Sequence, residues 1–156
     1  MMRFLRELNT HLQIRADPLY RYLRVFVSGQ ESFTRKTRDI QLKHQQWYFG
    51  KSLDGYTPMG PCIVTADEID NVHDLDITCY VNGEKRQSSN TGYMITTVEE
   101  AIAELSQGMT LSAGTVIATG TPGGVGMGMK PPVYLGSGDV VRCEIENIGV
   151  LENTVE

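Results

Sequence analysis

The chain has 156 residues, of which 40% are hydrophobic, and a formal net charge of −5. This length suits one domain with one core, and no apolar run approaches the roughly eighteen residues that a membrane-spanning helix needs. The three cysteines are scattered and form no Cys-x-x-Cys pair, which argues against a disulfide scaffold or a zinc site and favours a reducing, cytoplasmic location. We expect no secretory signal, because Met1-Met2-Arg3 is not followed by an apolar segment.

The charges are distributed unevenly along the chain. Residues 1–43 carry nine Lys and Arg against four Asp and Glu, whereas residues 44–156 carry five against fifteen. A basic arm of this kind could bind nucleic acid or act as a transit peptide. Acidic residues interrupt the basic face that either role needs, so we expect binding to neither nucleic acid nor membranes.

The N-terminal forty residues give a weak fold signal. Residues 3–12 have a short helical spacing of apolar side chains, and the stretch 19–27 is apolar without a clear period. Farther along, residues 62–65 are predicted to form a strand, followed by a turn at 67–70.

A β-hairpin is the best-marked element. Residues 76–81 alternate in polarity, and Asn82-Gly83 suits the two positive-φ positions of a type I′ turn. Residues 84–87 are then predicted to return as the partner strand.

One helix and three further strands complete the prediction. Thr97 and Glu100 form a capping box that opens a helix, and Gly108 can end it. Its apolar face is expected to contain Val98, Ala101, Ile102 and Leu105. Strands are expected at 115–119, 140–145 and 150–155, with a loop rich in glycine and proline at 120–132. Strands dominate, so the predicted fold class is α+β, mostly β.

Lys51 is the first candidate for chemistry. It lies between Gly50 and Ser52, directly after an aromatic triplet at 47–49. A lysine beside bulky apolar groups can anchor an anion strongly. Gly-Lys-Ser is not a P-loop here, because Gln45 occupies the position of the required glycine. A solvated surface lysine is the alternative interpretation.

Thr121 lies in a loop with glycines at 120, 123, 124 and 126. Glycine permits close approach of the backbone, so amide donors and the Thr121 hydroxyl could face an anionic group. A dinucleotide-binding fingerprint is not met, because Met129 stands where its last glycine is required. A plain flexible loop is the alternative.

Arg38 and Gln41 supply a fixed cation and an amide, which can bind a carboxylate and a carbonyl. A solvated turn is the alternative. The three histidines have no metal-ligand spacing, and we expect His73 to be a turn residue rather than a base. Glu99 is expected on the exposed side of the helix.

Several motifs together, in their order and spacing, resemble the fumarylacetoacetate hydrolase family over roughly residues 37–156. They are Arg38-Asp39-Ile40-Gln41, Gln46-Trp47, Gly50-Lys51-Ser52-Leu53-Asp54, Pro58-Met59-Gly60-Pro61, Val81-Asn82-Gly83-Glu84, Thr119-Gly120-Thr121-Pro122, Gly138-Asp139-Val140-Val141 and Ile148-Gly149. The resemblance implies a mixed β-roll or β-sandwich fold, usually a homodimer and here incomplete at its N-terminal side. It divides the chain into a divergent N-terminal segment, 1–36, and a partial catalytic domain, 37–156.

The resemblance also implies a chemistry. In this family Mg²⁺ or Mn²⁺ holds an oxo-acid or its enolate through two oxygens, and short oxo-dicarboxylic acids are hydrolysed, decarboxylated or isomerised. Carried over by position, Lys51 would neutralise the developing negative charge. Arg38 and Gln41 would contact the carbonyl or the distal carboxylate. Thr121, with the loop amides around Gly120 and Gly123, would hold the carboxylate of the pyruvate-like end.

The sequence departs from the family at the metal ligands. Thr34 stands where the resemblance implies an aspartate, and residues 1–46 contain no Glu-x-Glu pair. A neutral threonine lacks the anionic oxygen that a hard divalent cation favours, so no metal ligand is assigned. Two hypotheses follow: an oxo-acid hydrolase or isomerase, or a non-catalytic remnant that binds a small dicarboxylate or pairs with a full-length relative.

Overall fold

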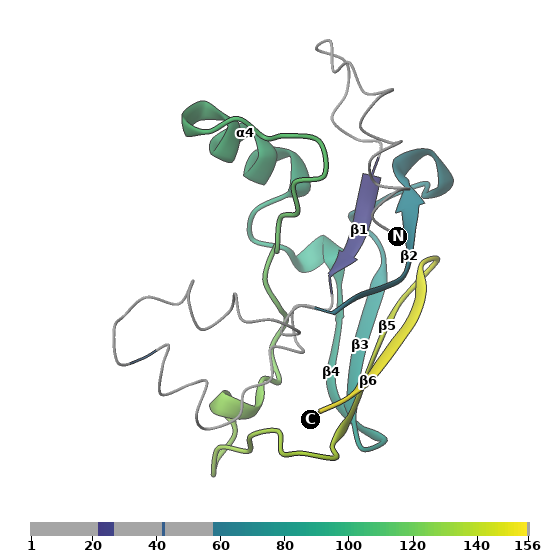
Figure 1. The fold of residues 1–156 in the computed structure, drawn as a ribbon, viewed down its shortest axis with the longest axis vertical. Helices are drawn as coiled ribbons and strands as arrows, with labels where there is room; N and C mark the ends of the chain where they lie inside the picture. The colour runs from purple at the N-terminus through teal and green to yellow at the C-terminus, as the bar shows by residue number, and fades with distance from the viewer. Residues whose placement is uncertain (1–21, 27–41, 43–57, 156) are drawn as a thin grey trace.

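The computed structural model describes residues 22–26, 42 and 58–155. Within this part, a two-stranded antiparallel sheet pairs β1 (Tyr22–Phe26) with β2 (Met59–Thr65). A second, antiparallel sheet has the strand order β4-β3-β5-β6 and contains β3 (Asp76–Val81), β4 (Glu84–Asn90), β5 (Val140–Ile145) and β6 (Gly149–Thr154). Figure 1 shows the helix α4 (Val98–Gly108) to one side of both sheets. The fold is therefore α+β and mostly β, as predicted.

The predicted hairpin is confirmed. β3 and β4 pair through a turn in which Asn82 has φ 52° and Gly83 has φ 80°, both in the left-handed region that an Asn-Gly turn favours. β4 continues to Asn90, three residues beyond the predicted end at residue 87. The Asn82 side chain also accepts a hydrogen bond from the Val140 backbone N–H at 2.9 Å, which fixes the turn against the start of β5.

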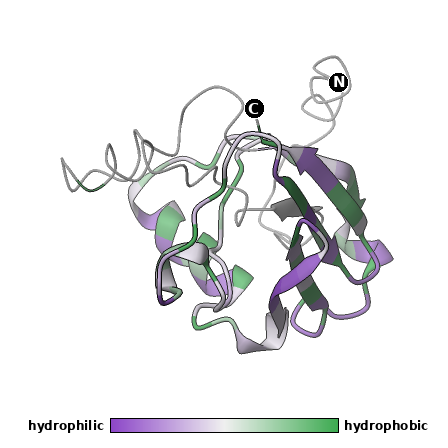
Figure 2. Ribbon diagram, turned by 90° about the horizontal axis from the view of Figure 1, so that it is seen from below, coloured by the Kyte–Doolittle hydropathy of each residue, from purple (hydrophilic) through white to green (hydrophobic). Residues whose placement is uncertain are grey.

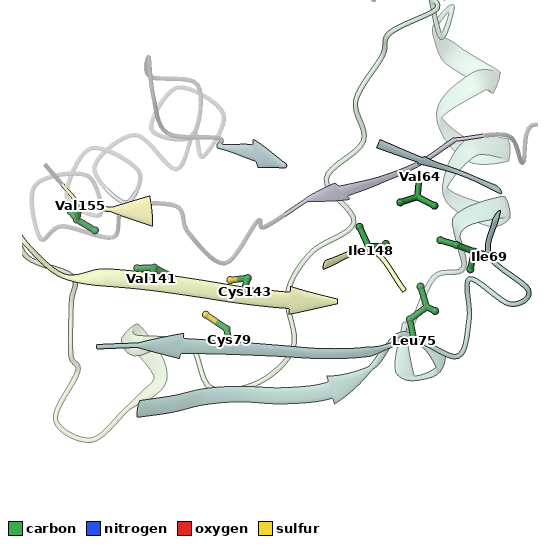
Figure 3. Packing of buried hydrophobic residues seen from close by; sticks show 8 residues of the cluster. All are labelled: Val64, Ile69, Leu75, Cys79, Val141, Cys143, Ile148 and Val155. Carbon is green, nitrogen blue, oxygen red and sulfur yellow. The ribbon is translucent and has the colours of Figure 1, made fainter. Parts of the chain in front are cut away.

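Alternation along the strands places the core between the sheets. Figure 2 shows hydrophobic and hydrophilic segments following each other along the strands. The buried hydrophobic residues are Val64, Ile69, Leu75, Cys79, Val141, Cys143, Ile148 and Val155. In Figure 3, Cys79 and Cys143 face each other across β3 and β5, and Leu75 lies near Ile69 at one end of the sheet. The smaller sheet is joined to this core by the Cys62 thiol, which lies 3.5 Å from the Ile148 carbonyl oxygen.

The helix begins where the sequence predicts. The Thr97 side chain accepts from the Glu100 N–H while the Glu100 side chain accepts from the Thr97 N–H, so the capping box is complete. The helix ends at Gly108, and Met109 is its C-cap. No residue of α4 is buried, so its apolar face is only half covered.

The strand predicted at 115–119 is wrong. These residues form irregular chain, and Val116 is 38% exposed. A β-branched run forms a strand only where it can pair and be buried, and no strand in the described ranges pairs with this segment. The last two strands are confirmed, with β6 beginning and ending one residue earlier than expected. In the described part of the chain, no helix is both long enough and apolar enough to cross a membrane.

Candidate functional site

Residues 119–129, called the glycine loop below, form the first candidate site. Figure 1 shows this segment on the path from α4 down past β4 to the short 3-10 helix η4 (Gly126–Gly128). Thr121 and Gly123 are exposed, and Gly120 has φ 103°. The loop thus has exposed residues and a backbone conformation at Gly120 that favours glycine.

The glycine loop lies directly against β4. At Gly124, where φ is 107°, an added Cβ would overlap the carbonyl oxygen of Arg86. Only glycine permits both this conformation and this approach. The Arg86 guanidinium continues the contact, because Nη1 lies 3.1 Å from the Met129 sulfur and Nη2 lies 3.1 Å from the Glu84 carboxylate.

Gln87 forms hydrogen bonds to two residues of the loop, Thr121 and Pro122. Its side chain is on β4 and the residue is 6% exposed. Its Nε2 donates to the Thr121 hydroxyl oxygen at 2.8 Å and to the Pro122 carbonyl oxygen at 2.8 Å. Thr121 and Pro122 are therefore fixed to β4 by hydrogen bonds from a buried amide, which argues against a plain flexible loop.

A second candidate is a cleft of about 660 Å³ over β3 and β4, away from the glycine loop. At its rim, His73 Nε2 lies 2.9 Å from the Glu99 carboxylate, and this hydrogen bond lowers the pKa of Glu99. Asn90 donates to the Asp74 and Asp76 carboxylates at 3.1 and 3.0 Å. These polar groups thus pair with one another, and Lys85, Ser88 and Ser89 also line the cleft. His73 lies in a turn, as predicted, and Glu99 is half-buried rather than on a fully exposed side.

Comparison with known proteins connects the glycine loop to a family. Residues 28–156 match the model of the fumarylacetoacetate (FAA) hydrolase family, C-terminal region. The chain belongs to the fumarylacetoacetate hydrolase family. Within the matched range lie the glycine loop, Gln87 and the whole four-stranded sheet.

Curated relatives in this family include oxaloacetate tautomerases. The chain is 51% identical over 119 residues to the mitochondrial oxaloacetate tautomerase Fahd2a of Rattus norvegicus, a match that covers 76% of this chain and 38% of the relative. It is 48% identical over 118 residues to the oxaloacetate tautomerase YisK of Bacillus subtilis, covering 76% of this chain and 39% of that protein. The chain thus spans well under half the length of these relatives.

Solved structures of the family agree with the fold. A fumarylacetoacetate hydrolase from the psychrophile Exiguobacterium antarcticum superposes with a TM-score of 0.73 at 55% identity, covering 76% of this chain and 43% of that one. A maleylpyruvate hydrolase from Sphingobium, in complex with manganese(II) and pyruvate, superposes with a TM-score of 0.62 at 37% identity. That match covers 69% of this chain and 38% of the hydrolase. By name, these family members are hydrolases and isomerases of small acids.

The structure describes some of the residues that the family resemblance assigns to a site, and their roles stay predictions. Thr121, Gly120 and Gly123 lie together in the glycine loop. Lys51, Arg38 and Gln41 lie outside the described residues, so their predicted roles stay predictions. The sequence does not single out Gln87, because a two-residue turn alone would pair Cys79 with Arg86, whereas a shift in register between Cys79 and Tyr80 places Gln87 opposite Cys79.

A divalent ion does not fit the described residues. Nowhere in residues 58–155 do three His, Cys, Asp or Glu side chains come together in a way that could hold a metal. Thr121 and Gln87 are neutral, whereas Mg²⁺ and Mn²⁺ favour carboxylate oxygens.

Proposed function

We propose that this chain carries the substrate-binding part of an enzyme that interconverts the keto and enol forms of a short oxo-dicarboxylic acid, with oxaloacetate as the first candidate. The identities of 51% and 48% to oxaloacetate tautomerases from a mammal and a bacterium support this substrate. C–C bond hydrolysis and decarboxylation are the neighbouring reactions, and the 37% identity to a maleylpyruvate hydrolase keeps hydrolysis as the closest competitor.

The observation that carries the proposal is the fixed glycine loop. Thr121, an exposed residue, and the loop backbone around it are held in place by Gln87 and by the close approach of Gly124 to β4. Donors that are already positioned bind an anion without reorganising when charge develops. We assign to Thr121, Gly120 and Gly123 the carboxylate next to the keto group.

The roles of Lys51, Arg38 and Gln41 are proposed from their positions in the motifs of the family. Lys51 would lie near the oxygen that becomes the enolate and neutralise its charge. Arg38 and Gln41 would bind the distal carboxylate or the carbonyl, since a guanidinium matches a carboxylate and an amide can donate to a carbonyl. In the isomerisation a proton leaves the carbon beside the carbonyl and a proton reaches the carbonyl oxygen, so the substrate's composition is unchanged.

We further propose Mg²⁺ or Mn²⁺ as the cofactor, supported by the manganese(II) and pyruvate bound to the related maleylpyruvate hydrolase. The described residues do not supply its ligands, so every step assigned above belongs to side chains and amides of the chain. A homodimer in the cytoplasm completes the proposal. Sedimentation velocity tests the dimer, and fractionation tests the location, for which the mitochondrial relatives are the contrasting case.

A second candidate function is metal-free binding of a small dicarboxylate, alone or paired with a full-length relative. It is favoured by one observation: the glycine loop is held by hydrogen bonds from the protein itself. A carboxylate could therefore bind to it without an ion.

A thermal-shift titration with Mg²⁺ and Mn²⁺, with and without oxalate as an enolpyruvate mimic, separates the two functions. Ligand at about one hundred times its Kd adds roughly 2.7 kcal/mol to the free energy of unfolding. A shift that needs metal and oxalate together supports the enzyme, and a shift with oxalate alone supports the binding protein. The absence of any shift contradicts both.

Turnover is then measured from the ultraviolet absorbance of enol-oxaloacetate. We expect Lys51→Ala to lower kcat/KM by roughly tenfold to a hundredfold, because it removes a charge that faces the enolate. Lys130→Ala removes an equal charge from an exposed position at the end of the loop region and controls for net charge. Equal turnover in the wild type and Lys51→Ala would remove Lys51 from the site.

A further inference from the structure

Gln87 is an unusual residue for the place it occupies. Among the described residues it is the one polar side chain that is buried, at 6% exposed, and its partner across the sheet is the core residue Cys79. A buried amide is costly unless its hydrogen bonds are made. Its side-chain nitrogen makes two hydrogen bonds of 2.8 Å, and both acceptors, the Thr121 hydroxyl and the Pro122 carbonyl, belong to the glycine loop.

The Pro122 carbonyl determines which way the Gln87 amide faces. A carbonyl oxygen can only accept, so the atom that faces it must be the amide nitrogen and not the amide oxygen. If the amide were turned over, its oxygen would face the Pro122 oxygen without a proton between them. The contact at 2.8 Å therefore fixes Nε2 on the side of the loop.

This orientation determines the hydrogen bond to Thr121. An amide nitrogen has two protons and no acceptor capacity, so Nε2 can only donate to the Thr121 oxygen, 2.8 Å away. The Thr121 hydroxyl thus uses a lone pair toward β4, and its own proton remains for another partner. Because Thr121 is an exposed residue, a ligand from solvent can approach it as that partner.

We propose that Gln87 is a positioning residue that makes Thr121 a hydrogen-bond donor to the substrate carboxylate. The inference rests on the proposed function, because it takes the ligand of the glycine loop to be a carboxylate. Gln87 acts through Thr121 and does not touch the substrate. A carboxylate can only accept, so a threonine presenting its proton attracts it and a threonine presenting lone pairs repels it.

Gln87→Glu tests this directly, because it keeps the size of the side chain and exchanges the donor for an acceptor. The ionised carboxylate introduced at this position would accept from Thr121, turn its proton inward and lie against the Pro122 oxygen. We expect oxalate affinity to fall by roughly tenfold to a hundredfold at neutral pH and kcat/KM to fall chiefly through KM. Gln107→Glu makes the same change at an exposed position of α4 and should leave affinity unchanged.

The pH profile distinguishes a donor role from a merely structural one. On acidification the introduced carboxyl gains a proton and can donate again, so oxalate affinity of Gln87→Glu should recover toward that of Gln107→Glu measured at the same pH. Burial raises the pKa of a carboxyl, so recovery should begin above the usual carboxyl range. A loss that is independent of pH overturns the proposal.

A measurement on the wild-type chain covers the case in which Gln87→Glu fails to fold. In an NMR spectrum, the Gln87 side-chain amide protons should exchange with water much more slowly than those of the exposed Gln107, and oxalate should shift them. Exchange as fast as that of Gln107 overturns the proposal.

The outcomes separate this inference from the proposed function. Wild-type oxalate binding with equal binding by Gln87→Glu overturns the role of Gln87 alone. Oxalate binding that depends on Gln87, without turnover of oxaloacetate, supports the role of Gln87 and overturns the tautomerase. A wild-type chain that binds no oxalate overturns both.

Discussion

At Gly124 the backbone of the glycine loop packs closely against β4. The Gly124 φ of 107° is costly for any residue with a Cβ, and that Cβ would overlap the Arg86 carbonyl oxygen. Two neighbouring residues of β4 therefore contact the loop in different ways. The Arg86 carbonyl oxygen leaves no room for a side chain at Gly124, and Gln87 donates hydrogen bonds to Thr121 and Pro122.

We predict that Gly124→Ala destabilises the chain by roughly 1–3 kcal/mol and weakens oxalate binding, because the loop must move away from β4. Urea denaturation and oxalate titration measure the two effects. Gly108→Ala is the matched control, since it lies in α4 with open space around it. It should be neutral or stabilising by about 0.5–1 kcal/mol. Equal effects of the two substitutions would contradict the close approach.

At the scale of elements, Asp139 joins the β3–β4 turn to the start of β5. Its carboxylate accepts from the Gly136 backbone N–H at 2.7 Å and from Asn82 Nδ2 at 2.8 Å. The Gly136 bond, then the Asn82 bond and the nearby Arg86 charge, lower the pKa of Asp139. The ionised form is therefore the one that stabilises the fold.

The sign of the pH dependence follows from this lowered pKa. The contribution of Asp139 is fully present above the ordinary pKa of aspartate, about 3.9, and is lost as pH falls through the lowered folded-state value. We predict that Asp139→Asn lowers Tm most near neutral pH and that the difference from wild type shrinks toward about pH 2. Asp70→Asn removes the same charge from an exposed position and controls for net charge. A Tm difference that does not vary with pH would contradict the assignment.

At the scale of the whole molecule, the core connects the two sheets through a few residues. Leu75 is 2% exposed and lies just before β3, near Ile69 in Figure 3. Val64 of β2 and Ile148 of the β5–β6 turn belong to the same buried cluster. Residues from both sheets therefore share one small core.

We predict that Leu75→Ala costs about 2–5 kcal/mol of the free energy of unfolding, because it leaves a cavity where both sheets meet. Urea denaturation monitored by circular dichroism measures it. Ile95→Ala is the control, since Ile95 is 102% exposed and its truncation should have little effect. A cost below about 1 kcal/mol for Leu75→Ala would mean that the site collapses around the smaller side chain.

Features with local causes could be predicted from the sequence alone. The Asn82-Gly83 turn follows from φ preferences of two residues, and the Thr97–Glu100 capping box follows from groups three residues apart. The family motifs also point to Thr121, Gly120 and Gly123, whose role in substrate binding stays a prediction. Lys51, Arg38 and Gln41 stay predictions outside the described residues, as does the boundary between 1–36 and 37–156.

Features that depend on residues far apart in the sequence could not be predicted in this way. Gln87 and Thr121 are 34 residues apart, so no local pattern indicates that the amide of one fixes the hydroxyl of the other. The run at 115–119 has strand-forming residues yet lies as irregular chain, whereas 22–26 is a strand because β2 pairs with it. Turns and caps are encoded by neighbours in sequence, but strand pairing and burial of a polar group are settled only when remote surfaces meet.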